Sequence, residues 1–98
     1  MPISFNKEND KLICAFSGRM DTVSCMEIKD EMKEKIEGYE GSVVFDMNEV
    51  DYISSSFLRI CAQVSTNVSN ENFSIINVTP NIKKVFMMAG LADKFNIE

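Results

Sequence analysis

Two apolar stripes with helical spacing, separated by runs typical of β-strands, constrain the fold of this chain most strongly. The first stripe, expected to begin at Asp21 or Thr22 and to stop at Gly38, has apolar residues three or four positions apart: Cys25, Ile28, Met32 and Ile36. The second repeats this spacing after a group of serines: Phe57, Ile60, Cys61, Val64 and Val68. Because apolar, β-branched runs flank both stripes, the pattern favours parallel strands joined by right-handed helical crossovers.

Short strands account for most of the remaining apolar residues. They are predicted over residues 3–6, 12–17, 42–45, 73–78 and 94–97. Gly18 and Asp46 are expected to end the second and third strands, and the polar residues 47–56 are expected to form a connection. The third strand is short and apolar, so we expect it to be central and covered on both faces.

A third helix is predicted after the fourth strand, because Thr79 can act as its N-cap and Pro80 suits its first position. Its expected apolar face comprises Ile82, Val85, Phe86 and Ala89. Gly90 is placed to cap its carboxyl end. Of the adjacent Met87 and Met88, at least one should face solvent or a partner, and core packing is favoured for the other.

Together these elements predict a single α/β domain over residues 1–98, in the order β-β-α-β-α-β-α-β. Its central sheet is expected to be mainly parallel, with helices packed on it. In such sheets, ligands and partners usually meet the loops at the carboxyl ends of the parallel strands. The serines at 54–56 lie at that edge.

The composition predicts a cytoplasmic protein without membrane insertion. No apolar run in the 98 residues approaches the roughly 20 that span a bilayer. The N-terminus also lacks the basic start and apolar core of a signal peptide. The cysteines, Cys14, Cys25 and Cys61, are odd in number and lie among apolar neighbours. They are best interpreted as buried thiols in a reducing compartment.

Missing residue types exclude several activities. The chain has no histidine and no CxxC pair, so the usual zinc ligand sets and histidine acid–base catalysis are absent. The phosphate-cradling motifs GxxxxGK[ST] and GxGxxG are also missing, and neither a metal nor a cofactor is expected. The net charge of -5 opposes direct nucleic-acid binding, which depends on neutralising phosphates. A non-enzymatic protein that binds other proteins is the favoured interpretation.

The segment VDYISSSFLRI places Ser54, Ser55 and Ser56 at the predicted start of the second helix. One serine there is explained as an N-cap, whose hydroxyl accepts a free N–H of the first turn. An N-cap uses only one hydroxyl, so three consecutive serines also suggest a modification site. A helix N-terminus stabilises a negatively charged phosphate, which favours phosphorylation as that modification. Nucleophilic catalysis is disfavoured because no histidine base, GxSxG elbow or SxxK spacing is present.

Asp46, after an apolar strand, could suggest a response-regulator phosphoacceptor. That interpretation requires further carboxylates at the end of an earlier strand to hold magnesium. Asp21 alone does not meet this requirement. We favour a loop residue that accepts hydrogen bonds from backbone N–H groups in the turn that follows it.

Three segments, taken in order, resemble one family. SGRMDT resembles a Gly-x-hydrophobic-Asp turn, and SVVFDMNEVDYISSSFLRI resembles a strand-Asp-loop-Asp-Ser-Ser-Gly-Leu signature. NVTPNIKKVFMMAGLADKFNI resembles a closing segment that follows them. The chain is therefore similar to a stand-alone STAS domain, the module of bacterial anti-sigma-factor antagonists and of the cytoplasmic tails of sulfate transporters.

The resemblance implies a partner-switching cycle centred on Ser55. The unmodified antagonist would bind a serine kinase/anti-sigma factor, phosphorylation of Ser55 would break that complex, and a phosphatase would restore it. The implied partner-binding residues are Asp21, Asp46, Ser54, Ser56, Phe57 and Arg59.

Two residues depart from the family pattern, because Ser54 replaces an acidic residue and Phe57 replaces a glycine. The Phe57 ring either projects where a kinase would approach or turns inward to the core. The alternative function is a constitutive STAS scaffold, such as an accessory subunit of a membrane-transport ATPase or of a signalling assembly, in which Ser55 only caps the helix.

Overall fold

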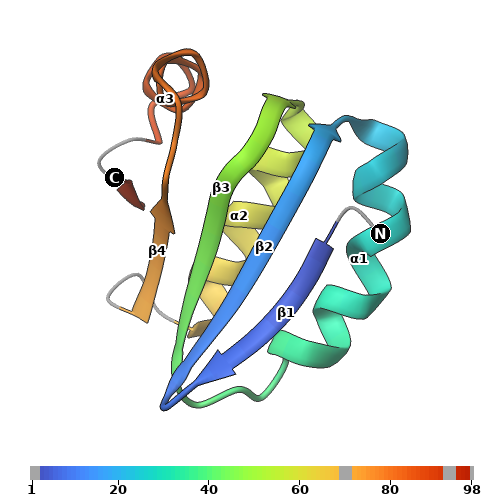
Figure 1. The fold of residues 1–98 in the computed structure, drawn as a ribbon, viewed down its shortest axis with the longest axis vertical. Coiled ribbons are helices and arrows are strands. Elements are labelled where there is room, and N and C mark those ends of the chain that lie inside the picture. Colours follow the sequence, from blue (N-terminus) through green and yellow to red (C-terminus); the bar gives the residue numbers. More distant parts are fainter. Residues whose placement is uncertain (1–2, 69–71, 92–94, 98) are drawn as a thin grey trace.

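The computed structural model describes residues 3–68, 72–91 and 95–97, and its elements follow the predicted order (Figure 1). In chain order they are β1 (Ile3–Glu8), β2 (Lys11–Met20), α1 (Thr22–Ile36), β3 (Ser42–Ile53), α2 (Ser55–Val68), β4 (Phe73–Ile76), α3 (Pro80–Met88) and β5 (Asn96–Ile97). Of the last predicted strand, residues 94–97, position 94 lies outside the described residues.

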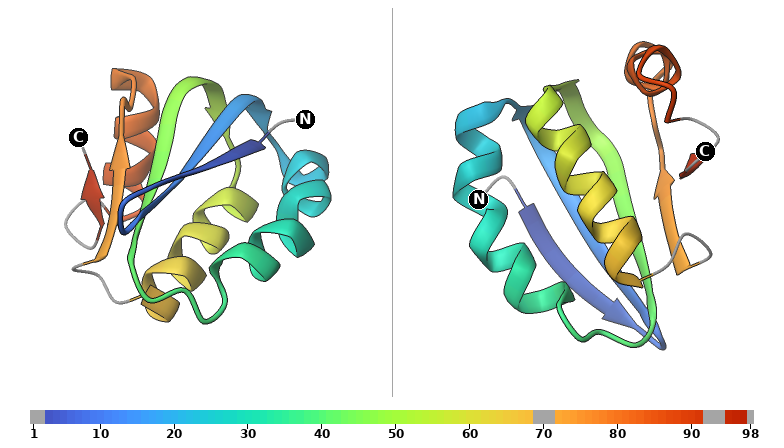
Figure 2. Two further views of the ribbon diagram at one scale, coloured as in Figure 1. Left: turned by 60° about the horizontal axis from the view of Figure 1, so that its bottom comes forward. Right: turned by 180° about the vertical axis from the view of Figure 1, so that it is seen from behind.

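One sheet with the strand order β1-β2-β3-β4-β5 organises the domain. β1 pairs antiparallel with β2, and all later neighbours are parallel. The α1 and α2 helices lie side by side against one face of the sheet, and α3 lies beyond the carboxyl end of β4 (Figures 1 and 2). The prediction of a mainly parallel α/β sheet with packed helices is confirmed.

The core lies between the sheet and the pair α1 and α2. Both predicted stripes are buried in it, as the spacing indicated. Aromatic rings pack edge to face within the sheet and between the layers: the Phe16 ring centroid lies 4.8 Å from that of Phe45, on the neighbouring strand, and 5.1 Å from that of Phe57 on α2. Such pairs add about 0.5–1.5 kcal/mol each beyond the apolar area they bury. The α2 helix is therefore held firmly on the sheet.

The three cysteines are free thiols and all are buried, as predicted. Burial raises the pKa of Cys14 to about 12 and raises that of Cys61 well above its usual value. Both thiols therefore stay protonated near neutral pH, which makes them poor nucleophiles.

Gly18 and Asp46 do not end their strands, contrary to the prediction. β2 continues to Met20 and β3 to Ile53, so residues 47–53 are strand rather than connection. The β2–β3 register slips between Ala15 and Ser17 and again at Gly18, and each slip adds one residue to β3. These bulges space the buried residues of β3 irregularly, so its polar exposed positions look like a loop in the sequence.

The part of β3 that the sequence predicted as a strand, residues 42–45, is buried from Val43 to Phe45, although α1 and α2 cover only one of its faces. Val43 and Phe45 point toward these helices, and Val44, on the opposite face, is still only 8% exposed. In Figure 1 no described helix lies in front of that second face. The expected burial is confirmed for residues 43–45 but not for Ser42, which is partly exposed, and the expected layer covering the second face is not seen among the described helices.

The α3 helix begins as predicted, with Thr79 as N-cap and Pro80 in the first turn. Gly90 follows the C-cap with φ +74°, a conformation that glycine adopts without strain. The predicted apolar face is only half correct: Ile82 and Phe86 are buried, but Val85 and Ala89 are exposed. Only one narrow edge of this short helix therefore reaches the core.

The predicted exposure of at least one methionine of α3 is confirmed, but the core packing predicted for the other and the predicted end of β4 are wrong. Met87 and Met88 are 61% and 79% exposed, so neither fills the core. β4 ends at Ile76 instead of Val78, because Asn77 takes a left-handed conformation with φ +58° that breaks the strand.

Candidate functional site

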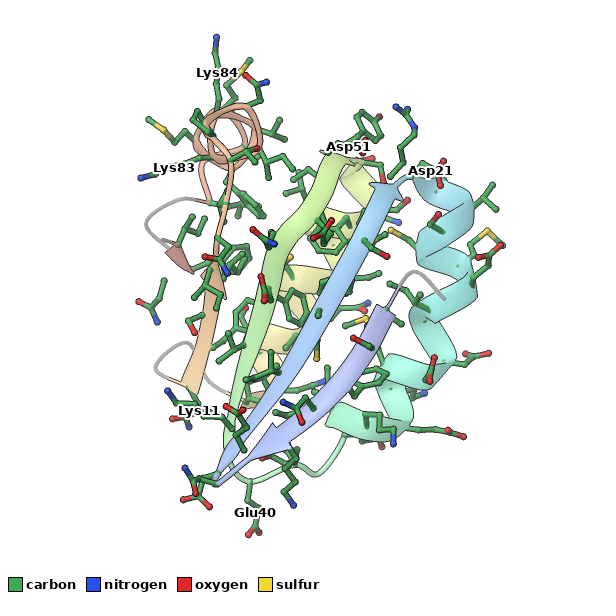
Figure 3. The ribbon with its side chains drawn as sticks, in the orientation of Figure 1. Lys11, Asp21, Glu40, Asp51, Lys83 and Lys84 are labelled. Atoms are coloured by element: carbon green, nitrogen blue, oxygen red, sulfur yellow. The ribbon has the colours of Figure 1, made fainter. Side chains whose placement is uncertain are left out.

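The carboxyl ends of β2 and β3 lie next to each other, and α1 and α2 begin directly after them. The Ser54 N–H donates to the Met20 carbonyl at 3.0 Å, which ties the two strand ends together. In Figure 3, Asp21 and Asp51 lie at this edge of the sheet, whereas Lys11 and Glu40 lie at the opposite end. The edge therefore brings Asp21 and the three serines into one cluster.

The second helix starts at the serines, as predicted. The Ser54 carbonyl accepts the N–H groups of Phe57 and Leu58 at 3.0 and 3.2 Å, so Ser54 occupies the N-cap position. Ser55 is the first helical residue and is exposed to solvent. Its hydroxyl thus lies at the positive end of the helix dipole.

The three serine hydroxyls lie in three different environments. Ser54 Oγ is buried and, within the described residues, has no hydrogen-bond partner. Ser56 Oγ donates to Thr22 Oγ1 at 3.5 Å, a long bond that joins the starts of α2 and α1. Ser55 alone of the three is classed as exposed. It is therefore the serine most accessible to a modifying enzyme.

Asp21 caps α1 from the same edge. Its Oδ1 accepts the Ser24 N–H at 2.9 Å, and its backbone carbonyl accepts the N–H of Cys25. The hydrogen bond from the Ser24 backbone, aided by the nearby charge of Arg19, lowers the pKa of Asp21. The carboxylate therefore remains ionised at neutral pH beside the serines.

Two neighbours complete the exposed surface of this edge. The Arg19 guanidinium lies 4.3 Å from the centroid of the Tyr52 ring, and these residues face each other across the β2–β3 register. Such a cation–π contact holds both side chains in place at the ends of the strands. The surface around Ser55 therefore carries both an aromatic ring and a cation.

Cys25 lies beneath the serines. Its Sγ is 3.8 Å from the Met20 carbonyl, and burial raises the pKa of the thiol while the neighbouring Ser54 hydroxyl opposes that rise. Since this buried thiol stays protonated near neutral pH and a serine hydroxyl is not a base there, neither group activates the exposed Ser55.

The Phe57 ring turns inward. It is 0% exposed and packs edge to face on Phe16, with Phe45 as a second neighbour. Of the two orientations that the sequence left open, the structure therefore has the buried one. The ring forms part of the core beneath the first turn of α2 and leaves the approach to Ser55 free.

Asp46 does not join this cluster. It lies between Phe45 and Met47, which point to the helices, so its side chain points to the opposite face. Seven residues of strand separate it from Ile53, roughly 20 Å at the usual rise per residue. Its Oδ1 accepts the Asn48 N–H and the Asn77 side-chain amide, each at 3.0 Å. The predicted hydrogen bond from a following backbone N–H is confirmed, but Asp46 is a strand residue rather than a loop residue, and its second partner is a side chain.

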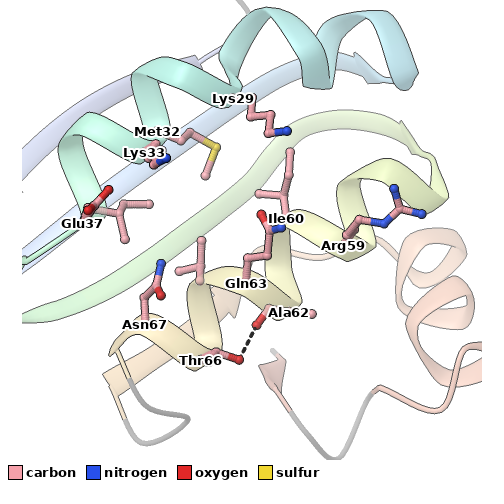
Figure 4. A pocket seen from close by; sticks show the side chains of 12 residues that line it. Lys29, Met32, Lys33, Glu37, Arg59, Ile60, Ala62, Gln63, Thr66 and Asn67 are labelled. Carbon is pink, nitrogen blue, oxygen red and sulfur yellow. Dashed lines mark hydrogen bonds between the residues drawn. The ribbon is translucent and has the colours of Figure 1, made fainter.

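Arg59 lies on α2, one turn beyond Ser55, and its side chain is exposed. It lines a groove between α1 and α2 together with residues of α1 (Figure 4). Arg59 thus faces the helix pair, to the side of the exposed surface around Ser55.

Sequence reasoning missed Thr22, Tyr52 and Arg19 as neighbours of the serines. The parallel order of β2 and β3 could have placed Thr22 there, since both helices begin at the same sheet edge. The sequence does not indicate the Arg19–Tyr52 pair, because it predicts a connection over residues 47–53 and cross-strand pairs form only between strands.

Among residues 3–68, 72–91 and 95–97, no helix has the length and apolar character needed to cross a membrane.

Comparison with known proteins agrees with this architecture. A protein of Bordetella bronchiseptica named "Putative anti-sigma factor antagonist BtrV" is 23% identical over 99 residues, covering 99% of this chain and 85% of the relative. An anti-sigma-factor antagonist (STAS) domain protein of Planctomyces limnophilus superposes with a TM-score of 0.86 at 16% identity, covering 98% and 87%. The Bacillus cell fate determinant SpoIIAA in its phosphorylated form gives 0.72 at 14% identity, covering 98% and 90%.

At these identities the two solved structures establish the fold alone. The family rests on a direct match of the sequence to the STAS domain model over residues 3–98, nearly the whole chain. The chain therefore belongs to the STAS domain family.

Proposed function

We propose that this chain is a partner-switching regulator of the anti-sigma-factor-antagonist type. In its unmodified form it binds a serine kinase/anti-sigma factor, and phosphorylation of Ser55 by that kinase breaks the complex. A phosphatase removes the phosphate and restores binding. The observation that carries the proposal is the exposed Ser55 at the first position of α2.

The local chemistry suits a phosphate on Ser55. A phosphoserine carries a charge of about -2 near neutral pH and accepts hydrogen bonds strongly. The first turn of α2 offers N–H donors and the positive end of a dipole, and the hydroxyl of Ser54 does not occupy those donors. Phosphorylation would therefore leave the fold intact and place a dianion on the surface that the partner must contact.

The buried ring of Phe57 supports this function. The kinase would approach Ser55 over a surface formed by polar groups and by Tyr52, with no large side chain at position 57. Of the implied contact residues, Asp21, Ser56 and Arg59 remain in the proposal. Ser54 would act indirectly by setting the start of α2, because its hydroxyl is buried and its N–H and carbonyl bond within the chain, and Asp46 lies on the wrong face for this partner.

The relatives support the regulatory class. One relative is named as an anti-sigma-factor antagonist, and a protein of the same fold has been solved in a phosphorylated form. An enzymatic role for Ser55 has no support, because the chain contains no histidine to act as its base. Since the kinase uses ATP, the proposal also places the protein in the cytoplasm.

Phosphorylation is tested by incubating the protein with the serine kinase/anti-sigma factor of the same organism and ATP, then measuring the intact mass. We expect one added phosphate on the native chain and on Ser4→Ala, a control at an exposed serine of β1, but none on Ser55→Ala. An unmodified native chain, or phosphate retained in Ser55→Ala, contradicts the proposal.

The switch itself is tested by calorimetric titration of the unmodified protein with the same kinase. Ser55→Ala should bind like the native chain, whereas Ser55→Glu should bind at least about tenfold more weakly, because a new charge meets a surface built for a neutral hydroxyl. Equal affinity of all three forms would instead favour the constitutive scaffold.

A further inference from the structure

The α2 helix carries a single charged side chain, Arg59, and no acidic residue of the same helix offsets it. Arg59 lies one turn beyond Ser55, where the helix begins. The positive end of a helix dipole disfavours a cation near the start of a helix. The charge of Arg59 therefore does not stabilise α2 while Ser55 is unmodified.

Arg59 and Ser55 are neighbours on the surface of α2. Side chains four residues apart on a helix lie on the same face, with about 5–6 Å between their Cβ atoms. Helical side chains also lean toward the start of their helix, and Figure 4 shows Arg59 extending toward that end of α2, away from Asn67. Both residues are exposed, and Arg59 makes no hydrogen bond or ion pair with a described residue. Its guanidinium can therefore reach a group on Ser55 without breaking another bond.

Two other cations lie nearby, but neither shares the helix of Ser55. Arg19 belongs to β2 and lies over the ring of Tyr52. Lys29 belongs to α1 and lines the groove opposite Arg59 (Figure 4). Only Arg59 has its position relative to Ser55 fixed by one continuous helix.

We propose that Arg59 is the intramolecular partner of a phosphate on Ser55, and that its guanidinium pairs with the phosphate instead of contacting the kinase. The inference rests on the proposed function, because it requires modification of Ser55. An acid that precedes a base by four residues is the favoured order on a helix, and the planar guanidinium suits two phosphate oxygens. Phosphorylation therefore adds a dianion to the surface and also removes a cation from the contacts available to the partner.

The test needs no kinase, because phosphoserine is incorporated at position 55 during synthesis of the chain. Phosphorus NMR then follows the second ionisation of the phosphate, whose ordinary pKa is about 6. The ion pair stabilises the dianion, so this pKa should lie at least about 0.3 lower with Arg59 present than in Arg59→Gln. Arg59→Lys should recover part of the difference. The Nε–H signal of Arg59 should also shift between the unmodified and phosphorylated chains.

The matched control is Lys83→Gln, which removes one exposed positive charge from α3 (Figure 3). It changes the net charge as much as Arg59→Gln does, so an equal rise of the phosphate pKa in both would show a general charge effect and overturn the proposal. Asp21 and Asp51 lie at the same edge as the phosphate and oppose its ionisation (Figure 3). They are present in every variant, so the differences report the cations alone.

Two further outcomes would overturn the pairing. One is a larger rise of the phosphate pKa in Arg19→Gln than in Arg59→Gln, because the β2 cation would then hold the phosphate. The other is an Arg59 signal that the phosphate leaves unchanged. Neither outcome affects the proposed function, since the charge on Ser55 alone can break the complex. Conversely, a native chain that the kinase leaves unmodified contradicts the proposed function but not the pairing measured in the synthetic phosphorylated chain.

Discussion

The starts of α2 and α3 carry the same kind of residue at the N-cap position but use it differently. In α3, Thr79 Oγ1 accepts the Ile82 N–H at 3.4 Å, and in α1 an aspartate performs the same task. In α2, Ser54 Oγ is buried and unpaired within the described residues. The cap of α3 therefore stabilises its helix, whereas the cap residue of α2 gives no side-chain acceptor to the first-turn N–H groups beside the exposed Ser55.

The two helices also differ in how they are anchored. The α2 helix has a buried stripe along its whole length, including Phe57 in the first turn. The α3 helix has nine residues and buries only Ile82 and Phe86. Since packing holds α2 in place, its start does not depend on a cap, and its N-terminus is free to serve recognition. The α3 helix has less packing and depends more on Thr79.

Removing the Phe57 ring should have the largest effect. Phe57→Ala deletes a 0% exposed side chain from the aromatic cluster, and we expect about 3–5 kcal/mol less stability in urea unfolding. Met88→Ala, at an exposed position of α3, should change stability by no more than about 0.5 kcal/mol. A loss below about 1 kcal/mol for Phe57→Ala would contradict the anchoring of α2, because burying a phenylalanine contributes more than that.

Removing the cap of α3 should have a smaller effect. Thr79→Ala leaves the Ile82 N–H without its side-chain partner, so we expect a loss of about 1 kcal/mol in the free energy of unfolding. Thr79→Ser retains an acceptor and serves as the control, with a much smaller loss. If alanine and serine are equally tolerated, the long hydrogen bond at α3 contributes nothing and the comparison between the helices weakens.

The cap of α1 should appear as a dependence of stability on pH. The pKa of Asp21 is lowered in the folded state from the ordinary 3.8, so its stabilisation is complete above 3.8 and is lost as pH falls through the lower folded value. The free energy of unfolding of Asp21→Asn should therefore decrease less than that of the native chain as the pH is lowered. Asp51→Asn, an exposed carboxylate at the same edge, is the control. The same decrease of the free energy of unfolding at acid pH for Asp21→Asn and the native chain would contradict this effect.

The sequence predicted some of these features for clear physical reasons. Apolar spacing identified α1 and α2 and already placed Phe57 in a buried stripe, so its inward orientation could have been inferred from that stripe alone. The Thr79-Pro80 pair located the start of α3. These features are local, because periodicity and capping depend only on residues within one or two turns.

Other features depend on tertiary pairing and could not be read from the chain. The two bulges of β3 break the period-two pattern, so residues 47–53 looked like a loop and Asp46 appeared to adjoin the serines. Similarly, nothing in the run of serines distinguishes a paired hydroxyl from an unpaired one. Only the positions of Thr22 and Cys25 on α1 separate Ser54, Ser55 and Ser56 from one another.

The smallest effect, with the opposite sign, is expected at Ser54. The buried Ser54 hydroxyl has no partner with hydrogen-bond geometry and contacts only the weakly bonding Cys25 thiol, so Ser54→Ala removes a desolvated polar group and loses no strong hydrogen bond. Stability should stay constant or rise by up to about 1 kcal/mol, whereas the equivalent change at Thr79 destabilises. The kinase should still phosphorylate Ser55 in this variant. A loss as large as that of Thr79→Ala would show that the Ser54 hydroxyl does cap α2 in solution, and the first-turn donors would then not be free for a phosphate.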